Sequence, residues 1–202
     1  MQVIIYGKAG SIFTPRTWFL FRALGHDHEK VHLLQGSFEE WVAAGGATEE
    51  NETQVPLASE IFAKKSASPA YVAKEPTNVV DMKAMLEAYK SEEVIMIDPR
   101  GSSFAKGHIP GSVHVPYSEL VEEDNQLKLK SREELMGIFE KAGVDPMTEK
   151  TIITTCGSGV SVCHVLLALE ECGRADKPTM MYDGSWAEWG KDPDTPKASS
   201  EQ

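Results

Sequence analysis

The stretch TIITTCGSGVS, residues 151–161, joins a β-forming run to a cysteine and a glycine-containing loop. Residues 152–155 lean toward β structure and predict a buried strand that ends at Cys156. Gly157 and Gly159 permit backbone angles that other residues avoid, which suits a tight loop. Apolar residues then recur at helical spacing, at Val162, Val165, Leu166 and Leu169. The order strand, loop, helix indicates a parallel α/β fold.

A cysteine between a strand end and a helix N-terminus is well placed to act as a nucleophile. The loop amides and the positive end of the helix dipole favour negative charge at the sulfur of Cys156, which promotes ionisation of the thiol. A small buried core residue is the alternative, because free cysteine is usually found in cores. The glycines and the hydroxyl groups nearby favour the functional interpretation. The candidate site is Cys156 with the loop of Gly157, Ser158, Gly159, Val160 and Ser161.

The composition limits the classes of function. The chain has 202 residues, 41% of them hydrophobic, which is enough for one good core or for one domain plus part of another. The formal net charge of −11 argues against binding to nucleic acid or to an anionic membrane surface. No apolar run is long enough to span a membrane. Three cysteines without metal-ligand spacing indicate a reducing compartment: Cys156, Cys163 and Cys172.

Alternating strands and helices are predicted on both sides of the cysteine loop. Besides 152–155, strands are expected at 3–6, 31–34, 94–97 and 179–182, with a short one within 107–116. Helices are expected from Thr14 to Gly25, over 36–45, over 78–89 with Asn78 or Asp81 as the cap, from Ser131 to Gly143, from the loop to Gly173, and at Trp186 and Trp189. Residues 122–124 read as a solvated acidic loop.

The first 46 residues form a strand-helix-strand-helix unit that is too small to cover both faces of a parallel sheet. The expected organisation is a partial domain at 1–46, a linker at 47–77, a complete α/β domain at 78–197 and a tail at 198–202. GSFEEW at 36–41 and GSWAEW at 184–189 each follow a strand, which suggests two copies of one domain with the first incomplete. Exposed apolar surface is therefore expected beside the N-terminal strands.

Three motifs together resemble the second domain of a two-domain rhodanese, a sulfurtransferase. They are DPR-x3-F-x2-GHIPGS at 98–112, CGSGVS at 156–161 and YDGSWAEW at 182–189. Residues 6–26 and 33–41 resemble the back half of the inactive first domain of that family. The resemblance covers nearly the whole chain and implies a rhodanese-like parallel sheet flanked by helices. It also implies that no metal or organic cofactor is needed. The expected compartment is the cytoplasm, with mitochondria as the alternative.

The resemblance implies a double-displacement cycle. Cys156 takes a sulfur from a small donor, becomes a persulfide and passes the sulfur to a thiol such as thioredoxin, or to cyanide. The neutral Gly157–Ser158 pair is similar to the 3-mercaptopyruvate branch, whereas the thiosulfate branch tends to carry basic residues there. Inward amide N–H groups at 157–161 would stabilise the persulfide as an oxyanion hole stabilises oxygen.

The donor site departs from the family pattern. Two arginines hold the donor carboxylate in the mercaptopyruvate branch; Ser103 stands at the position of one, and the other has no counterpart. Arg100 is the nearby arginine and a candidate substrate contact, with a structural role at the strand end as the alternative.

Other functions fit parts of the sequence. Related folds with a cysteine loop act as phosphatases or arsenate reductases, but these need an arginine six positions after the cysteine, where this chain has Val162. A catalytically impaired binding or regulatory module is a further alternative, against which the intact CGSGVS motif argues. His108 is expected to make a turn-stabilising hydrogen bond. Cys163 is expected to pack against the sheet rather than to resolve an oxidised Cys156.

Overall fold

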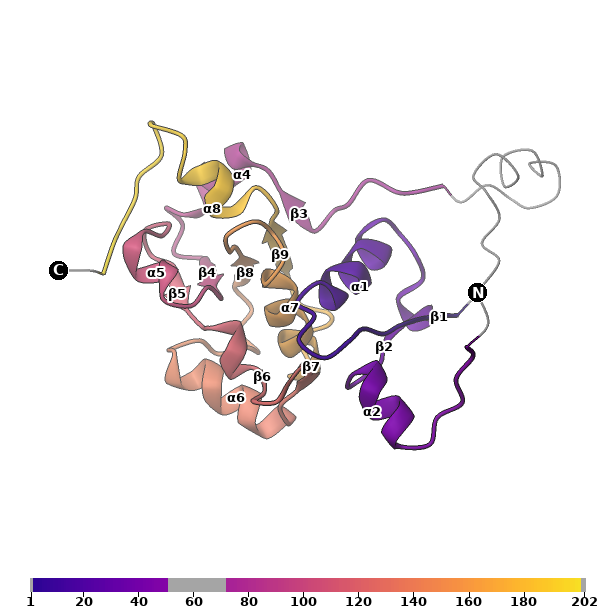
Figure 1. Ribbon diagram of the computed structural model, residues 1–202. Coiled ribbons are helices and arrows are strands. Elements are labelled where there is room, and N and C mark those ends of the chain that lie inside the picture. Colours follow the sequence, from indigo (N-terminus) through magenta and orange to yellow (C-terminus); the bar gives the residue numbers. More distant parts are fainter. Residues whose placement is uncertain (1, 51–71, 201–202) are drawn as a thin grey trace.

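A five-stranded parallel sheet forms the centre of the computed structural model, which describes residues 2–50 and 72–200 (Figure 1). In sheet order the strands are β3 (Val79–Val80), β9 (Thr179–Tyr182), β8 (Thr151–Thr154), β4 (Val94–Asp98) and β5 (Val113–His114). All pairings in this sheet are parallel, because a helix returns the chain to the same edge between successive strands. The predicted parallel α/β architecture is confirmed.

Helices cover both faces of this sheet. They are α6 (Arg132–Lys141) and α7 (Val162–Glu171) on one face, and α4 (Met82–Ala88) and α8 (Ser185–Trp189) on the other. Side chains alternate along a strand, so Ile152 packs against the first pair of helices and Ile153 against the second. A strand buried on both faces has no polar face to alternate with, which fits the continuous β-branched run of Thr and Ile before Cys156. None of the helices in the described ranges has the length and apolar character that crossing a membrane requires.

The N-terminal segment forms a second, smaller parallel sheet. Its elements are β1 (Val3–Ile5), α1 (Thr14–Ala23), the 3-10 helix η1 (His28–Lys30), β2 (Val31–Leu33) and α2 (Phe38–Ala43). Helix α1 lies beside α7, and Trp18 and Phe19 share an apolar cluster with Cys163 and Leu166 (Figure 1). The segment is therefore packed into the core of the main domain through α1.

The strand predicted at 3–6 is buried on one side only. Ile5 is buried, whereas the side chains of Ile4 and Tyr6 are 66% and 60% exposed. With Phe38 and Trp41 of α2, these two side chains border an apolar groove of about 550 Å³. The expected exposed apolar surface is confirmed, because no element in the described ranges covers this side of the small sheet.

One local prediction was wrong at its start, where a short strand depends on a distant partner. Residues 78–89 are not one helix, because Val79 and Val80 pair with β9; the helix begins after Asp81, the second of the two expected caps. The acidic loop predicted at 122–124 is present as the tip of an antiparallel hairpin of β6 (Val121–Glu122) and β7 (Asn125–Leu129), with Glu123 and Asp124 exposed. A short helix, α5 (Ser103–Lys106), and a 3-10 helix, η2 (Tyr117–Glu119), were not predicted.

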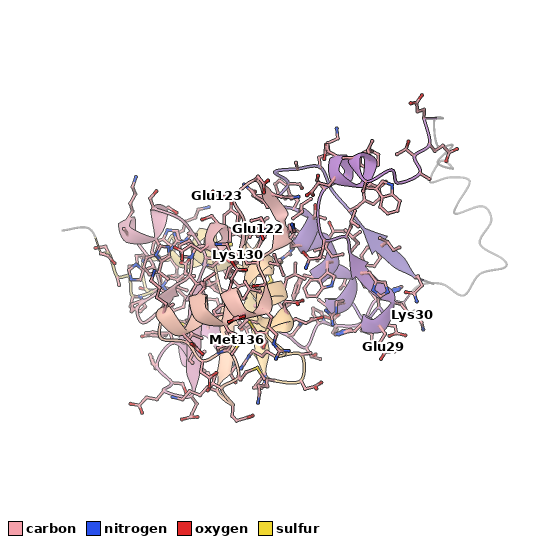
Figure 2. The ribbon with its side chains drawn as sticks, turned by 90° about the horizontal axis from the view of Figure 1, so that it is seen from below. Glu29, Lys30, Glu122, Glu123, Lys130 and Met136 are labelled. Carbon is pink, nitrogen blue, oxygen red and sulfur yellow. The ribbon has the colours of Figure 1, made fainter. Side chains whose placement is uncertain are left out.

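The β6–β7 hairpin connects the main domain to the N-terminal segment. Gly36 N donates a hydrogen bond to Leu127 O at 3.2 Å, and Leu129 N donates to Gln35 Oε1 at 3.1 Å. The hairpin, marked by Glu122 and Glu123 in Figure 2, therefore lies next to that segment. The boundaries at residues 46, 77 and 197 stay predictions, and most of the predicted linker, 51–71, and the end of the tail, 201–202, lie outside the described residues.

Candidate active site

Cys156 lies just beyond the C-terminal end of the central strand β8, and residues 156–161 connect that strand to α7. Functional groups in open parallel sheets collect at this end of the strands. The side chain of Cys156 is 1% exposed and belongs to an apolar cluster with Phe19 of α1 and Met181 of β9. The cysteine side chain is therefore buried, and it lies next to the N-terminal segment.

The carbonyl groups of the loop are bound from outside the loop. Five of the six carbonyl oxygens at 156–161 accept a hydrogen bond. The pairs are Trp186 N to Cys156 O and Ala187 N to Gly157 O, both 2.9 Å, Arg16 Nη1 to Gly159 O, 3.0 Å, and Cys163 N to Val160 O and His164 N to Ser161 O, both 3.1 Å. These donors come from α8, α1 and α7, so three helices shape the loop.

Most amide N–H groups of the loop, in contrast, have no acceptor among the described residues. Cys156 N donates to Ser185 Oγ at 3.2 Å, but the five N–H groups of residues 157–161 have no acceptor within the part of the chain that the structure describes. Successive unpaired N–H groups beside a helix N-terminus form a concave site for an anion. The ten-residue helix α7 adds the positive end of its dipole here. The loop can therefore stabilise negative charge next to the cysteine sulfur.

Gly159 is a position of this loop that requires glycine. Its φ is +77°, in the left-handed region that favours glycine. A β-carbon at this position would lie 2.7 Å from Asp183 Oδ1 and 3.0 Å from the backbone oxygen of Asp183. Both the conformation and the available space therefore require glycine.

Arg100 lies beside the loop, where its guanidinium group is largely engaged. Nε and Nη2 donate to the carboxylate of Asp98 at 3.0 and 2.7 Å, and Nη2 also donates to Gly107 O at 2.8 Å. The group stacks over the ring of Trp186, and the side chain is 8% exposed. These contacts fit the structural alternative. Only Nη1 has no hydrogen-bond partner among the described residues.

Sequence reasoning missed Ser185, Arg16 and Asp183 at this site. Ser185 has a φ of +53°, accepts from Cys156 N and donates to Tyr182 O at 2.9 Å. A signal for it existed, since Ser185 corresponds in the repeated GS-x2-EW motif to Ser37, the N-cap of α2. No local signal pointed to Arg16 or Asp183, because one comes from α1 and the other from the turn after β9.

Several side chains near the loop have structural roles. As predicted, His108 makes a turn-stabilising contact, with Nδ1 2.9 Å from Phe104 O. Cys163 is fully buried, and burial raises the pKa of its thiol to about 12, so it stays protonated and packs in the core. Trp189 is also fully buried, whereas Trp186 is half-buried. Among the described residues, no three His, Cys, Asp or Glu side chains gather closely enough to hold a metal ion.

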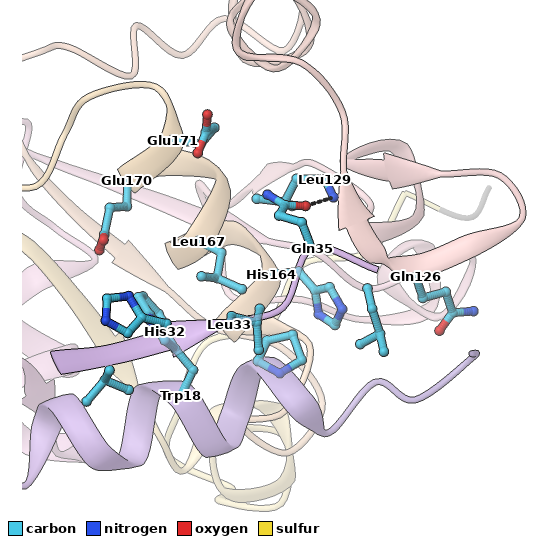
Figure 3. A pocket seen from close by; sticks show the side chains of 13 residues that line it. Trp18, His32, Leu33, Gln35, Gln126, Leu129, His164, Leu167, Glu170 and Glu171 are labelled. Atoms are coloured by element: carbon cyan, nitrogen blue, oxygen red, sulfur yellow. Dashed lines mark hydrogen bonds between the residues drawn. The ribbon is translucent and has the colours of Figure 1, made fainter. Parts of the chain in front are cut away.

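A cavity of about 350 Å³ lies between the N-terminal segment and α7, away from the cysteine (Figure 3). Trp18, His32, Gln126 and His164 are among its lining residues, and Cys156 is not. His164 is 1% exposed, and neither ring nitrogen finds a hydrogen-bond partner in the described part of the chain. Burial lowers the pKa of His164 to about 4, although the nearby backbone of Gln126 and Ser161 favours the protonated ring.

Protonation of His164 is expected to make stability depend on pH. The histidine pKa is about 6.5 in an unfolded chain, so as pH falls the unfolded state binds the proton first. The contribution to stability is complete above pH ~6.5 and is lost as pH falls toward 4. From pH 7.5 to 5, His164 should lower the free energy of unfolding by about 2 kcal/mol, measured by urea denaturation. His164→Leu should lack this part of the pH dependence; an identical dependence in both proteins would contradict the assignment.

Comparison with known proteins places the site in context. Residues 79–192 match the family model of the rhodanese-like domain. Mouse 3-mercaptopyruvate sulfurtransferase is 33% identical over 204 residues, which cover 93% of this chain and 62% of the mouse protein. Chicken thiosulfate sulfurtransferase is 31% identical over 201 residues, covering 93% and 63%. The chain thus spans less than two thirds of the length of these curated relatives.

Solved structures agree with this comparison. The crystal structure of a 3-mercaptopyruvate sulfotransferase from Escherichia coli superposes with a TM-score of 0.72 at 31% identity, over 92% of this chain and 66% of that one. An anaerobic ergothioneine biosynthesis enzyme from Chlorobium limicola gives a TM-score of 0.80 over 100% of this chain and 52% of that one. At 22% identity the second likeness concerns the fold alone.

Proposed function

Because the chain belongs to the rhodanese-like family, we propose that it moves a sulfane sulfur from 3-mercaptopyruvate or thiosulfate to a thiol or cyanide through a persulfide on Cys156. The observation that carries this proposal is the row of five N–H groups at 157–161 that find no acceptor among residues 2–50 and 72–200. A persulfide has negative charge on its outer sulfur, one bond beyond Sγ. Preorganised N–H groups can stabilise that charge as they stabilise an oxyanion.

The proposed cycle has two displacement steps. The thiolate of Cys156 attacks the sulfur of the donor, and an S–S bond forms as the C–S bond of 3-mercaptopyruvate breaks. The electron pair leaves with the enolate of pyruvate, which takes up a proton; from thiosulfate, sulfite leaves instead. An acceptor thiolate then attacks the outer sulfur and becomes a persulfide, while Cys156 leaves as the thiolate. With cyanide as acceptor, thiocyanate is the product.

Local groups must attract the donor, since both donors are anions and the formal net charge of the chain is −11. The loop carries no cationic side chain of its own, and we assign donor contact to Nη1 of Arg100, the one nitrogen of that group that Asp98 and Gly107 leave unbound. One N–H edge and a row of amides suit a single carboxylate better than a doubly charged anion. We therefore expect 3-mercaptopyruvate to be the better donor.

Intact-protein mass after incubation with 3-mercaptopyruvate, and separately with thiosulfate, tests the proposal. We expect a gain of one sulfur atom, which peptide mapping places on Cys156 and which reduced thioredoxin removes. The donor that loads the protein faster identifies the preferred substrate. No gain of sulfur from either donor would reject the enzyme and favour the binding or regulatory module.

Gly159→Ala is expected to slow sulfur loading by about 100-fold. The added methyl group displaces the loop from Asp183, and removal of a single oxyanion-hole donor costs about 10²–10³ in rate. Rapid-quench mass measurement of sulfur on Cys156 checks this.

Gly143→Ala provides the matched control. Gly143 follows α6 with a φ of +81°, and a β-carbon there would meet no atom within 4 Å. This variant should lose about 1 kcal/mol of stability from the same kind of strained backbone and keep the wild-type loading rate. Equal slowing in both variants would show that the effect is one of stability and not of loop shape.

A further inference from the structure

We propose that the N-terminal segment is part of the catalytic site, because Arg16 of α1 holds the cysteine loop in its reactive shape. This inference rests on the proposed function. Arg16 Nη1 donates to Gly159 O at 3.0 Å and pairs with Asp183 Oδ1 at 2.7 Å, with Met181 Sδ at 3.4 Å. Arg16 is a positioning residue, since it acts on the sulfur through the loop backbone.

The planarity of the peptide bond explains how a contact with a carbonyl can matter to the sulfur. In a trans peptide the C=O of one residue and the N–H of the next point in opposite directions. The Arg16 contact that holds Gly159 O outward therefore holds the N–H of Val160 toward the opposite side, with the other unpaired amides. Without that contact, this peptide unit can rotate and present its carbonyl oxygen, a negative dipole end, where the persulfide needs a donor.

Other peptide units of the loop are held by backbone donors of the main domain. Trp186 N and Ala187 N bind the carbonyls of Cys156 and Gly157, and Cys163 N binds that of Val160. Of the six loop carbonyls, within the described ranges, Gly159 O alone is bound by side chains: by Arg16 of the N-terminal segment at 3.0 Å, and by Cys163 Sγ of α7 in a longer contact of 3.9 Å. The 79–192 family match does not include Arg16.

The Arg16–Asp183 ion pair is too exposed to contribute much to the stability of the fold. The two side chains are 23% and 51% exposed, and ion pairs at such exposure contribute little to stability. Arg22, on the same helix, makes a comparable pair with Glu170 of α7, at 13% and 39% exposure. Both pairs join the segment to the main domain, but only Arg16 also binds the cysteine loop. Arg22 is therefore a matched control.

The test compares Arg16→Gln with Arg22→Gln in the full chain. Two rates are measured: single-turnover sulfur loading from 3-mercaptopyruvate, and alkylation of Cys156 by iodoacetamide, with peptide mapping to separate the three cysteines. We expect Arg16→Gln to lower both rates by about 10- to 100-fold, less than complete loss of an oxyanion-hole donor because the peptide still samples its inward orientation. Arg22→Gln should stay within about twofold of wild type.

Further readouts separate positioning from a general structural role. The donor concentration for half-maximal loading should change little in Arg16→Gln, because Arg16 does not bind the donor in this proposal. Arg16→Lys should recover much of the rate, since an ammonium can still donate to Gly159 O, and the thermal midpoints of the two glutamine variants should agree. Wild-type rates in Arg16→Gln, or equal losses in both glutamine variants, would overturn the inference. If wild type takes sulfur from neither donor, the proposed function fails, and the alkylation rates still decide on Arg16.

Discussion

A Cys156→Ser variant is expected to gain no sulfur from either donor under conditions that load the wild-type protein. Serine keeps the size of the side chain and the position of its donor atom, so the loop should retain its shape. The hydroxyl group does not ionise at neutral pH and is a far weaker nucleophile than a thiolate. Loss of the nucleophile in a comparable two-step enzyme costs about 10⁶ in rate. Intact mass after each donor measures the loss.

Cys163→Ser and Cys172→Ser are the controls for this experiment. Burial raises the pKa of these two thiols to about 12 and about 11, so both remain protonated where Cys156 must react as thiolate. Both variants should load one sulfur at a rate close to wild type. Wild-type loading of Cys156→Ser would assign the acceptor role to another group and refute the persulfide at Cys156.

The central part of the fold could be predicted from the sequence because its signals are local. The β-branched run before Cys156 and the apolar spacing after it correspond to β8 and α7, both buried against the core. The expected cap at Ser131 is present, with Ser131 accepting from Glu134 N and the Glu134 side chain accepting from Ser131 N. Such elements are specified by residues a few positions apart.

Strand β3 could not be predicted, because a distant partner specifies it. Val79 and Val80 become a strand only beside Met181 and Tyr182, a hundred positions further along the chain. The local pattern there is compatible with the helix that begins after Asp81, so periodicity alone wrongly extended the predicted helix over Val79 and Val80. Hydrogen bonds to a neighbouring strand outweigh intrinsic preference in such a short segment.

The candidate site also has a part that could be predicted from local sequence and a part that could not. Cys156 and its glycine-containing loop could be singled out from composition and position, and the amide cradle at 157–161 was expected there. The groups that orient the cradle could not be found, since Arg16 lies 143 positions from the carbonyl it binds. A sequence motif shows which atoms can form an anion site, whereas the tertiary structure determines which way each peptide points.

The largest expected loss of stability comes from Arg174→Met. Arg174 is 2% exposed, and its guanidinium group donates to four carbonyl oxygens and one hydroxyl. The acceptors are Pro146 O (3.0 Å), Thr148 O (2.6 Å), Lys150 O (2.5 Å), Pro178 O (2.9 Å) and Thr179 Oγ1 (2.9 Å). They lie in the segments leading into β8 and β9, so one side chain joins the starts of the two central strands.

Methionine keeps most of the apolar stem of Arg174 but none of its donors. Burial lowers the pKa of the guanidinium group, because loss of water destabilises its charged form. The five hydrogen bonds offset this loss of hydration. Removing the guanidinium group leaves several buried carbonyls unpaired, and we expect a loss of about 3–5 kcal/mol in the free energy of unfolding. Urea denaturation measures this loss.

Lys177→Met is the control, because it removes a nearby cation whose partner, Glu149, is 87% exposed. We expect it to lower the free energy of unfolding by less than about 1 kcal/mol. Similar small losses in both variants would mean that water replaces Arg174 at these carbonyls and that the strand starts do not depend on it.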